Sequence, residues 1–166
     1  MRLFYAIWPD DHTREKLASI SRNLNVGKVI PPENLHLTLL FLGDIQDELA
    51  MAILSGTDTI QCPKFRLKLS RFGSFKRSGV FWLAPDNIPG ELITLVNNLS
   101  ELAVMNNIAV EDRPYRPHMT LARKIKTQIH LESQDFAMQV SKFSLVESKT
   151  LPQGAKYSVL KTWPLT

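Results

Sequence analysis

The stretch LHLTLLFLG, residues 35–43, is typical of a β-strand that carries a single ionisable side chain. Side chains alternate between the two faces of a strand, so we expect His36 and Thr38 on one face and Leu37 on the other. Phe41 follows the phase of Leu37, and we expect it to pack in the core rather than against a nucleobase. An imidazole and a hydroxyl therefore share one polar track on an otherwise apolar strand.

The same pattern returns in the second half of the chain, in the stretch HMTLAR at residues 118–123. Here His118 and Thr120 share one face, and Met119 points into the core. The chain has only 4 histidines, and chance would place a histidine two positions before a threonine roughly 0.24 times. A single motif of this kind is more often structural. Two matching motifs favour one site in which two imidazoles and two hydroxyls converge.

This set of groups suits hydrolysis of a phosphodiester. Imidazole titrates near neutral pH, so one ring can take a proton from an attacking water while the other gives a proton to the leaving oxygen. Threonine hydroxyls can hydrogen-bond the oxygens of a phosphate held between them. A zinc site is the rival explanation, but it needs three or four ligands, and neither motif offers a further ligand at the right spacing. We therefore expect no metal and no cofactor.

The composition is that of an ordinary globular protein, with 166 residues of which 44% are hydrophobic and 22% charged. It predicts one domain over residues 1–166, and a monomer is the expected state. The net charge of +4 suits an anionic partner such as RNA or a nucleotide, although charge alone carries little weight. Cys62 is the only cysteine, which excludes an intramolecular disulfide and fits a reducing cytoplasm. We expect no signal peptide and no membrane helix.

Strand patterns and helix patterns are mixed along the chain, which predicts the α+β class. We expect strands over residues 2–8, 35–42, 65–75, 80–85, 118–122, 136–150 and 155–163, and helices over residues 9–24, 45–57 and 89–108. A strand, a helix and a strand with the H-x-T motif recur in each half. This weak internal repeat predicts two lobes that are related by a pseudo-two-fold axis, each of which contributes one histidine.

The paired motifs, in this order and with these flanks, resemble the two-histidine (2H) phosphoesterase superfamily. More closely, the chain resembles the RNA 2′,3′-cyclic phosphodiesterases, also called the 2′-5′ RNA ligase family. The resemblance covers nearly the whole chain. It is carried by RLFYAIWP (2–9), NLHLTLLFLGDI (34–45), YRPHMTLAR (115–123) and ESKTLPQGAKYSVLKTWPL (147–165).

The resemblance implies a bilobal fold, with antiparallel sheets and flanking helices around a central cleft. It implies a metal-independent reaction that opens a terminal 2′,3′-cyclic phosphate of RNA, or of a small cyclic nucleotide, to a 2′-phosphate. His36 is then the proton donor to the 3′ oxygen, and His118 is the proton acceptor that activates water. Thr38 and Thr120 hold the phosphate. Arg123 follows the second motif and is either a phosphate contact or a solvated strand end.

Other activities remain compatible with the same residues. The same acid and base serve the reverse attack by an RNA 5′-hydroxyl, which is 2′-5′ ligation. A non-catalytic RNA-binding module is the third hypothesis. Tyr115 and Arg116 directly precede the second motif and are candidates for the lining of the cleft. The predicted hairpin carries three basic residues with two interleaved phenylalanines, and these either receive an RNA strand or form a solvated edge: Arg71, Lys76, Arg77, Phe72 and Phe75.

Overall fold

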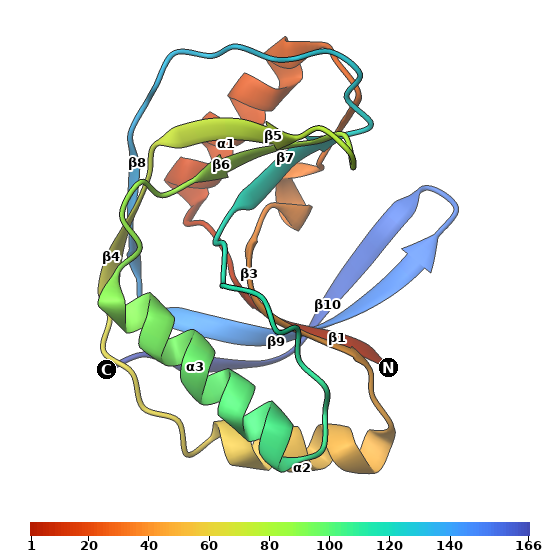
Figure 1. The fold of residues 1–166 in the computed structure, drawn as a ribbon, viewed down its shortest axis with the longest axis vertical. Helices are drawn as coiled ribbons and strands as arrows, with labels where there is room; N and C mark the ends of the chain where they lie inside the picture. Colours follow the sequence, from red (N-terminus) through yellow and green to blue (C-terminus); the bar gives the residue numbers. More distant parts are fainter.

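The computed structural model describes all residues, 1–166, and shows two lobes joined near the centre of the molecule (Figure 1). The elements follow in the order β1 (Arg2–Ile7), α1 (Asp11–Leu24), β2 (Lys28–Val29), η1 (Pro32–Asn34), β3 (Leu37–Asp44), α2 (Asp47–Thr57), β4 (Phe65–Leu69), β5 (Arg71–Phe75), β6 (Val80–Ala84), α3 (Gly90–Met105), β7 (Met119–Arg123), β8 (Phe136–Val140), β9 (Lys142–Leu151) and β10 (Gly154–Pro164).

One large antiparallel sheet runs through both lobes. Its strands follow the order β10-β9-β1-β3-β7-β6-β5, and β2 pairs with β7. At the middle of this path, β3 and β7 pair at only one position, Leu37 with Met119. The sheet therefore divides into a half with β1, β3, β9 and β10 and a half with β5, β6 and β7 (Figure 1). The expected α+β class and bilobal arrangement are confirmed, with the two sheet halves meeting at a single residue pair.

Two segments that were expected as continuous strands are each divided by a serine, so these predictions were wrong. Residues 65–75 form β4 and β5, which separate at Ser70, and residues 136–150 form β8 and β9, which separate at Ser141. In each case the earlier strand belongs to a separate two-stranded sheet, β4-β8, and the later strand joins the large sheet.

The sequence does mark these divisions, because the buried apolar residues switch between odd and even positions at each serine. Leu67 and Leu69 are buried at odd positions before Ser70, whereas Phe72, after it, packs against the core from an even position. Ser70 itself is buried, and its hydroxyl donates a hydrogen bond of 2.8 Å to a carboxylate oxygen of Asp86. This bond satisfies a polar group at the bend, which would otherwise be costly to bury.

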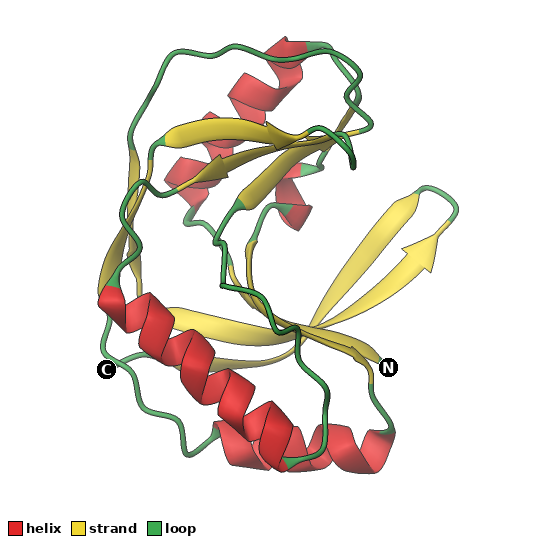
Figure 2. Cartoon of the chain, viewed as in Figure 1, coloured by secondary structure: helices red, strands yellow, loops and turns green.

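The helices cover the outer faces of the sheet halves (Figure 2). Helix α1 begins where expected, since the Asp10 side chain accepts a hydrogen bond of 2.7 Å from the Thr13 amide. Helix α3 ends at Met105 and not at Ile108 as expected, because Asn107 takes a left-handed conformation with φ of 60°. Helices α2 and α3 pack against each other below β1 and β9 (Figure 1).

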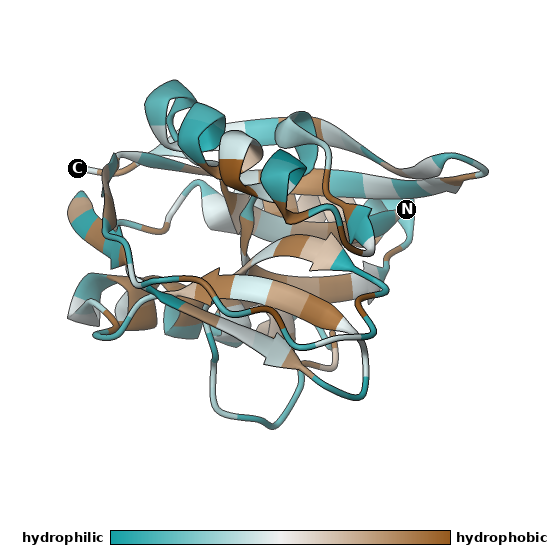
Figure 3. Ribbon diagram, turned by 90° about the horizontal axis from the view of Figure 1, so that it is seen from above, coloured by the Kyte–Doolittle hydropathy of each residue, from teal (hydrophilic) through white to brown (hydrophobic).

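The hydrophobic core extends through both lobes. One cluster of 33 buried residues includes Leu37 and Leu39 from β3 together with Met119 and Leu121 from β7. Figure 3 shows hydrophobic stretches along the strands inside the molecule and hydrophilic ones on the outer helices. The residues between the motif histidines and threonines thus anchor both motifs in a common core, as the strand alternation predicts. None of the helices has the length and apolarity needed to cross a membrane.

A tyrosine hydroxyl reinforces the joint between the lobes. Tyr115, in the segment that leads to β7, donates a hydrogen bond of 2.8 Å to the backbone carbonyl of Thr38 in β3. Burial raises the pKa of this phenol, so it remains a donor throughout the pH range of interest. The approach to the second motif is therefore fastened to the backbone of the first motif.

We expect Tyr115→Phe to lower the free energy of unfolding by about 1 kcal/mol, because the Thr38 carbonyl loses a partly buried donor. Chemical denaturation measures this change. The matched control is Tyr157→Phe, since Tyr157 is also half-buried but its hydroxyl makes no hydrogen bond within the protein. Equal stability of the two variants would contradict a role for the Tyr115 hydroxyl in joining the lobes.

Candidate active site

The two motif histidines lie at equivalent positions on either side of the joint. His36 directly precedes β3 and His118 directly precedes β7, so each ring stands just outside the strand in which it was expected. Because Leu37 pairs with Met119 in antiparallel register, one step along this register sets His36 across from Thr120, on the same face. One step the other way sets Thr38 across from His118. The arrangement is that of a local two-fold axis through the central pair.

Each ring is held by the carbonyl two residues before it. Nδ1 of His36 lies 2.7 Å from the carbonyl oxygen of Asn34, and Nδ1 of His118 lies 2.8 Å from that of Arg116. A carbonyl only accepts, so both Nδ1 atoms carry the proton and donate it. In the neutral rings, Nε2 is therefore the basic atom, and in the cationic rings it is the atom that donates.

His36 is enclosed by aromatic side chains. Its ring centroid lies 5.1 Å from Phe4, 5.6 Å from Trp8 and 5.2 Å from Tyr157. This burial lowers the pKa of His36, and the nearby charge of Arg123 lowers the pKa further, against the opposing effect of the Asn34 carbonyl. Nε2 lies 3.1 Å from the Thr38 hydroxyl, which donates to it in the neutral ring. The free ring is thus biased towards neutrality.

His118 has a more open environment. Its ring meets the ring of Phe75 edge to face, with centroids 5.3 Å apart. Its hydrogen bond to the Arg116 carbonyl lies at the surface, unlike the half-buried bond of His36. The two rings therefore share one tautomer but differ in their access to solvent.

All five site residues predicted from the sequence border one cavity of about 440 Å³. Its lining comes from both sheet halves and from the hairpin of β9 and β10, and consists of Arg2, Phe4, His36, Thr38, Phe41, His118, Thr120, Arg123, Ser148, Thr150 and Tyr157. No acidic side chain is among them, while two arginines and two histidines are. The cavity is therefore suited to an anion.

Phe41 belongs to this cavity and not to the core, so its expected position was wrong. The pairing of β1 with β3 skips Leu39, which lies between Thr38 and Phe41, and this irregularity turns Phe41 to the same face as Thr38. The Phe41 ring is 44% exposed, stacks on Phe4 at 5.8 Å and lies 5.1 Å below the guanidinium of Arg2. An exposed aromatic ring and an arginine on the wall of one cavity are groups that can contact a base.

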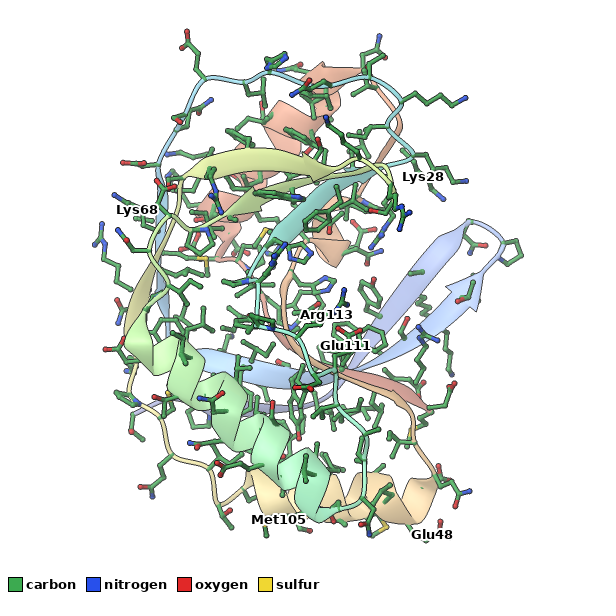
Figure 4. All side chains as sticks on the ribbon, viewed as in Figure 1. Lys28, Glu48, Lys68, Met105, Glu111 and Arg113 are labelled. Carbon is green, nitrogen blue, oxygen red and sulfur yellow. The ribbon has the colours of Figure 1, made fainter.

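The hairpin of β9 and β10 supplies further lining that motif spacing did not indicate. Ser148, Thr150 and Tyr157 come from this hairpin. The Asn34 side-chain amide donates a hydrogen bond of 3.1 Å to the Ala155 carbonyl. Lys28, which Figure 4 shows on the side of the upper lobe that faces the hairpin, donates one of 3.5 Å to the Gln153 carbonyl. The hairpin is therefore tied to the segment that leads to the first motif.

Comparison with known families agrees with this geometry. The model of the LigT-like phosphoesterases matches twice, over residues 7–82 and over residues 83–157. The chain belongs to this family, which is part of the 2H phosphoesterase superfamily. Each match contains one H-x-T motif, so the two motifs lie in two segments of the chain that are each similar to the same family model, and each segment contributes strands to both sheet halves. This repeated match agrees with the repeated pattern in the sequence and with the local two-fold axis.

Well-matched relatives span the whole chain. The RNA 2′,3′-cyclic phosphodiesterase of Escherichia coli is 33% identical over 99% of this chain and 97% of its own length. The enzyme of the same name from Thermus thermophilus is 32% identical over 99% of this chain and 90% of its own. Among solved structures, E. coli LigT complexed with 3′-AMP superposes with a TM-score of 0.93 at 32% identity, covering 99% of this chain and 98% of that one.

The pKa of His36 provides a direct test of the site's electrostatics. We expect a value below the ordinary 6.5 in the free protein, because burial and Arg123 both disfavour the cation. Removing the charge in Arg123→Gln should raise it. NMR titration of the His36 ring protons measures both values. Arg66→Gln, which removes an exposed arginine from β4 outside the cavity, is the control and should leave the pKa unchanged. A pKa that is insensitive to Arg123 would contradict this account.

Proposed function

We propose that this protein hydrolyses the terminal 2′,3′-cyclic phosphate of RNA, or that of a small cyclic nucleotide, to a 2′-phosphomonoester. The observation that carries the proposal is the inverted pair of imidazoles on one cationic cavity, each with Nδ1 held by a carbonyl and Nε2 available for proton transfer. The relatives named as RNA 2′,3′-cyclic phosphodiesterases support the same reaction, since they match over nearly the whole chain.

In this proposal the two rings act at opposite ends of an in-line displacement. Nε2 of His118 takes a proton from water, the water oxygen bonds to phosphorus, and the bond from phosphorus to the 3′ oxygen breaks. Nε2 of His36, protonated, gives its proton to that 3′ oxygen. The product keeps its phosphate on the 2′ oxygen, and no metal or cofactor takes part. General acid and general base catalysis contribute about 10²- to 10⁴-fold each in such reactions.

The remaining lining residues act on the phosphate itself. Thr38 and Thr120 donate hydrogen bonds to its non-bridging oxygens, and Arg123 offsets the charge that builds on them in the transition state. The bound anion also has a second effect. His36 is biased towards neutrality in the free protein, and a negative charge beside the ring favours the cation. Substrate binding thus favours protonation of His36, whose proton is then transferred to the 3′ oxygen.

We propose that the chain works as one domain and as a monomer. A hydrophobic cluster of 33 buried residues spans both lobes, which supports a single domain. The lone thiol, Cys62, is buried and its pKa is raised by burial, which fits a structural residue in the reducing cytoplasm and not a nucleophile.

Activity without metal tests the mechanism. With 2′,3′-cyclic AMP in the presence of EDTA, we expect 2′-AMP as the only product of the wild-type protein. His36→Ala and His118→Ala should each lower kcat by about 10²- to 10⁴-fold, because each removes one proton transfer. His130→Ala removes an exposed histidine outside the cavity and serves as the control. A 3′-phosphate product, or loss of activity on chelation, would be incompatible with the proposal.

The pH dependence is a second test. We expect a bell-shaped profile of kcat/KM, since one ring must be neutral and the other cationic. One limb should lie below pH 6.5, because the pKa of His36 in the free protein is lowered by its burial. Arg123→Gln should move that limb to higher pH, as removal of a positive charge favours the His36 cation. Stopped assays over a range of buffers measure the profile, and a limb that does not move would count against this assignment.

A further inference from the structure

A second cavity opens beside the first and shares His118 with it. Its volume is about 240 Å³, and its walls come from β5, β6, the loop after β6 and the segment before β7. His36 does not border it. The two cavities therefore meet at the ring to which the proposed mechanism gives the role of base.

The walls of the second cavity carry the groups that bind nucleosides. Phe75 and Trp82 form an aromatic side, and the guanidinium of Arg71 lies 5.7 Å from the centre of the Trp82 ring. Arg116 adds a second cation, and Asp86 adds a carboxylate that can accept from the amino group of a base. Aromatic rings with interleaved arginines are the pattern with which proteins bind single-stranded nucleic acid. The volume lies below the roughly 300–1,000 Å³ of sites for drug-sized ligands, which suits one base.

We propose that this second cavity is the acceptor subsite for the nucleoside at an RNA 5′-hydroxyl end. The inference rests on the proposed function and extends it. In the hydrolysis, water attacks phosphorus from the side of His118. An alcohol that replaces this water must reach phosphorus from the same side, and the second cavity is the space that adjoins His118 there. The cyclic-phosphate end occupies the first cavity, where Phe41 offers a separate platform for its base.

The chemistry of this step balances without a co-reactant. The 5′ oxygen gives its proton to Nε2 of His118 and bonds to phosphorus, while the bond from phosphorus to the 3′ oxygen breaks. His36 protonates the 3′ oxygen, so the product is a 2′-5′ diester with a free 3′-hydroxyl. In the reverse direction the 3′-hydroxyl attacks, and His118 protonates the departing 5′ oxygen. A 2′-5′-linked dinucleotide must therefore fill both cavities, whereas a cyclic mononucleotide fills only the first.

Two substrates test the proposed subsite, because one needs only the first cavity and the other needs both cavities. We would measure initial rates with 2′,3′-cyclic AMP and with 2′-5′-linked ApA, the latter by release of adenosine. Ile88→Trp, at an exposed position on the wall of the second cavity, inserts a ring where the base would lie, and Arg71→Ala removes a cation from that wall. We expect each variant to lower cleavage of the dinucleotide by about tenfold, the scale of one lost stacking or cation contact.

Hydrolysis of 2′,3′-cyclic AMP by the same variants should change by less than about twofold, because water needs no nucleoside subsite. Arg66→Ala, which removes an exposed arginine from outside both cavities, is the matched control and should alter neither rate. Joining of two oligoribonucleotides, one with a cyclic phosphate and one with a 5′-hydroxyl, should follow the dinucleotide rates.

The outcomes separate this inference from the proposed function. A wild-type protein that hydrolyses cyclic AMP but neither cleaves the dinucleotide nor joins RNA would overturn the acceptor subsite alone. An equal fall in both activities in Ile88→Trp would overturn it too, since it would place the base of the cyclic nucleotide in the second cavity. No hydrolysis of cyclic AMP by the wild-type protein would overturn the proposed function itself.

Discussion

The structure depends on a single backbone contact, the pairing of Leu37 with Met119. Both side chains are buried in the common core, and the two halves of the large sheet diverge on either side of this pair. Divergence leaves room for a cavity, while the pair keeps the strand ends in contact. Because the contact is antiparallel, it relates the two motifs by a local two-fold axis. The two sheet halves are thus joined directly beside the two motifs.

The symmetry of the site is broken by what surrounds the two rings. His36 lies among Phe4, Trp8 and Tyr157, and its pKa is lowered by this burial. His118 lies at the meeting point of two cavities. In the proposed reaction these environments suit different tasks. An enclosed ring delivers its proton to the leaving oxygen and not to bulk water, whereas an open ring can serve nucleophiles of different size.

The sequence predicted the chemistry of the site better than its shape. The alternation of polar and apolar residues around His36 and His118 was sufficient to place both rings and both threonines on one face. Phe41 was assigned to the wrong face, because alternation assumes a regular strand and an irregularity at Leu39 in the pairing with β1 reverses the phase before Phe41. Tyr157 and Ser148 escaped notice because the hairpin reaches the cavity only through tertiary packing. The breaks at Ser70 and Ser141 were signalled by changes of apolar phase, without the glycine or proline that usually marks a turn.

Asn34 has two structural roles, one through its backbone and one through its side chain. Its backbone carbonyl orients the His36 ring, and its side-chain amide holds the Ala155 carbonyl in the hairpin of β9 and β10. The hairpin in turn supplies Tyr157, whose ring meets His36 edge to face. A displacement of the hairpin would therefore loosen the support of the His36 ring on two sides at once. The position of the hairpin and the orientation of the His36 ring are therefore linked through Asn34 and Tyr157.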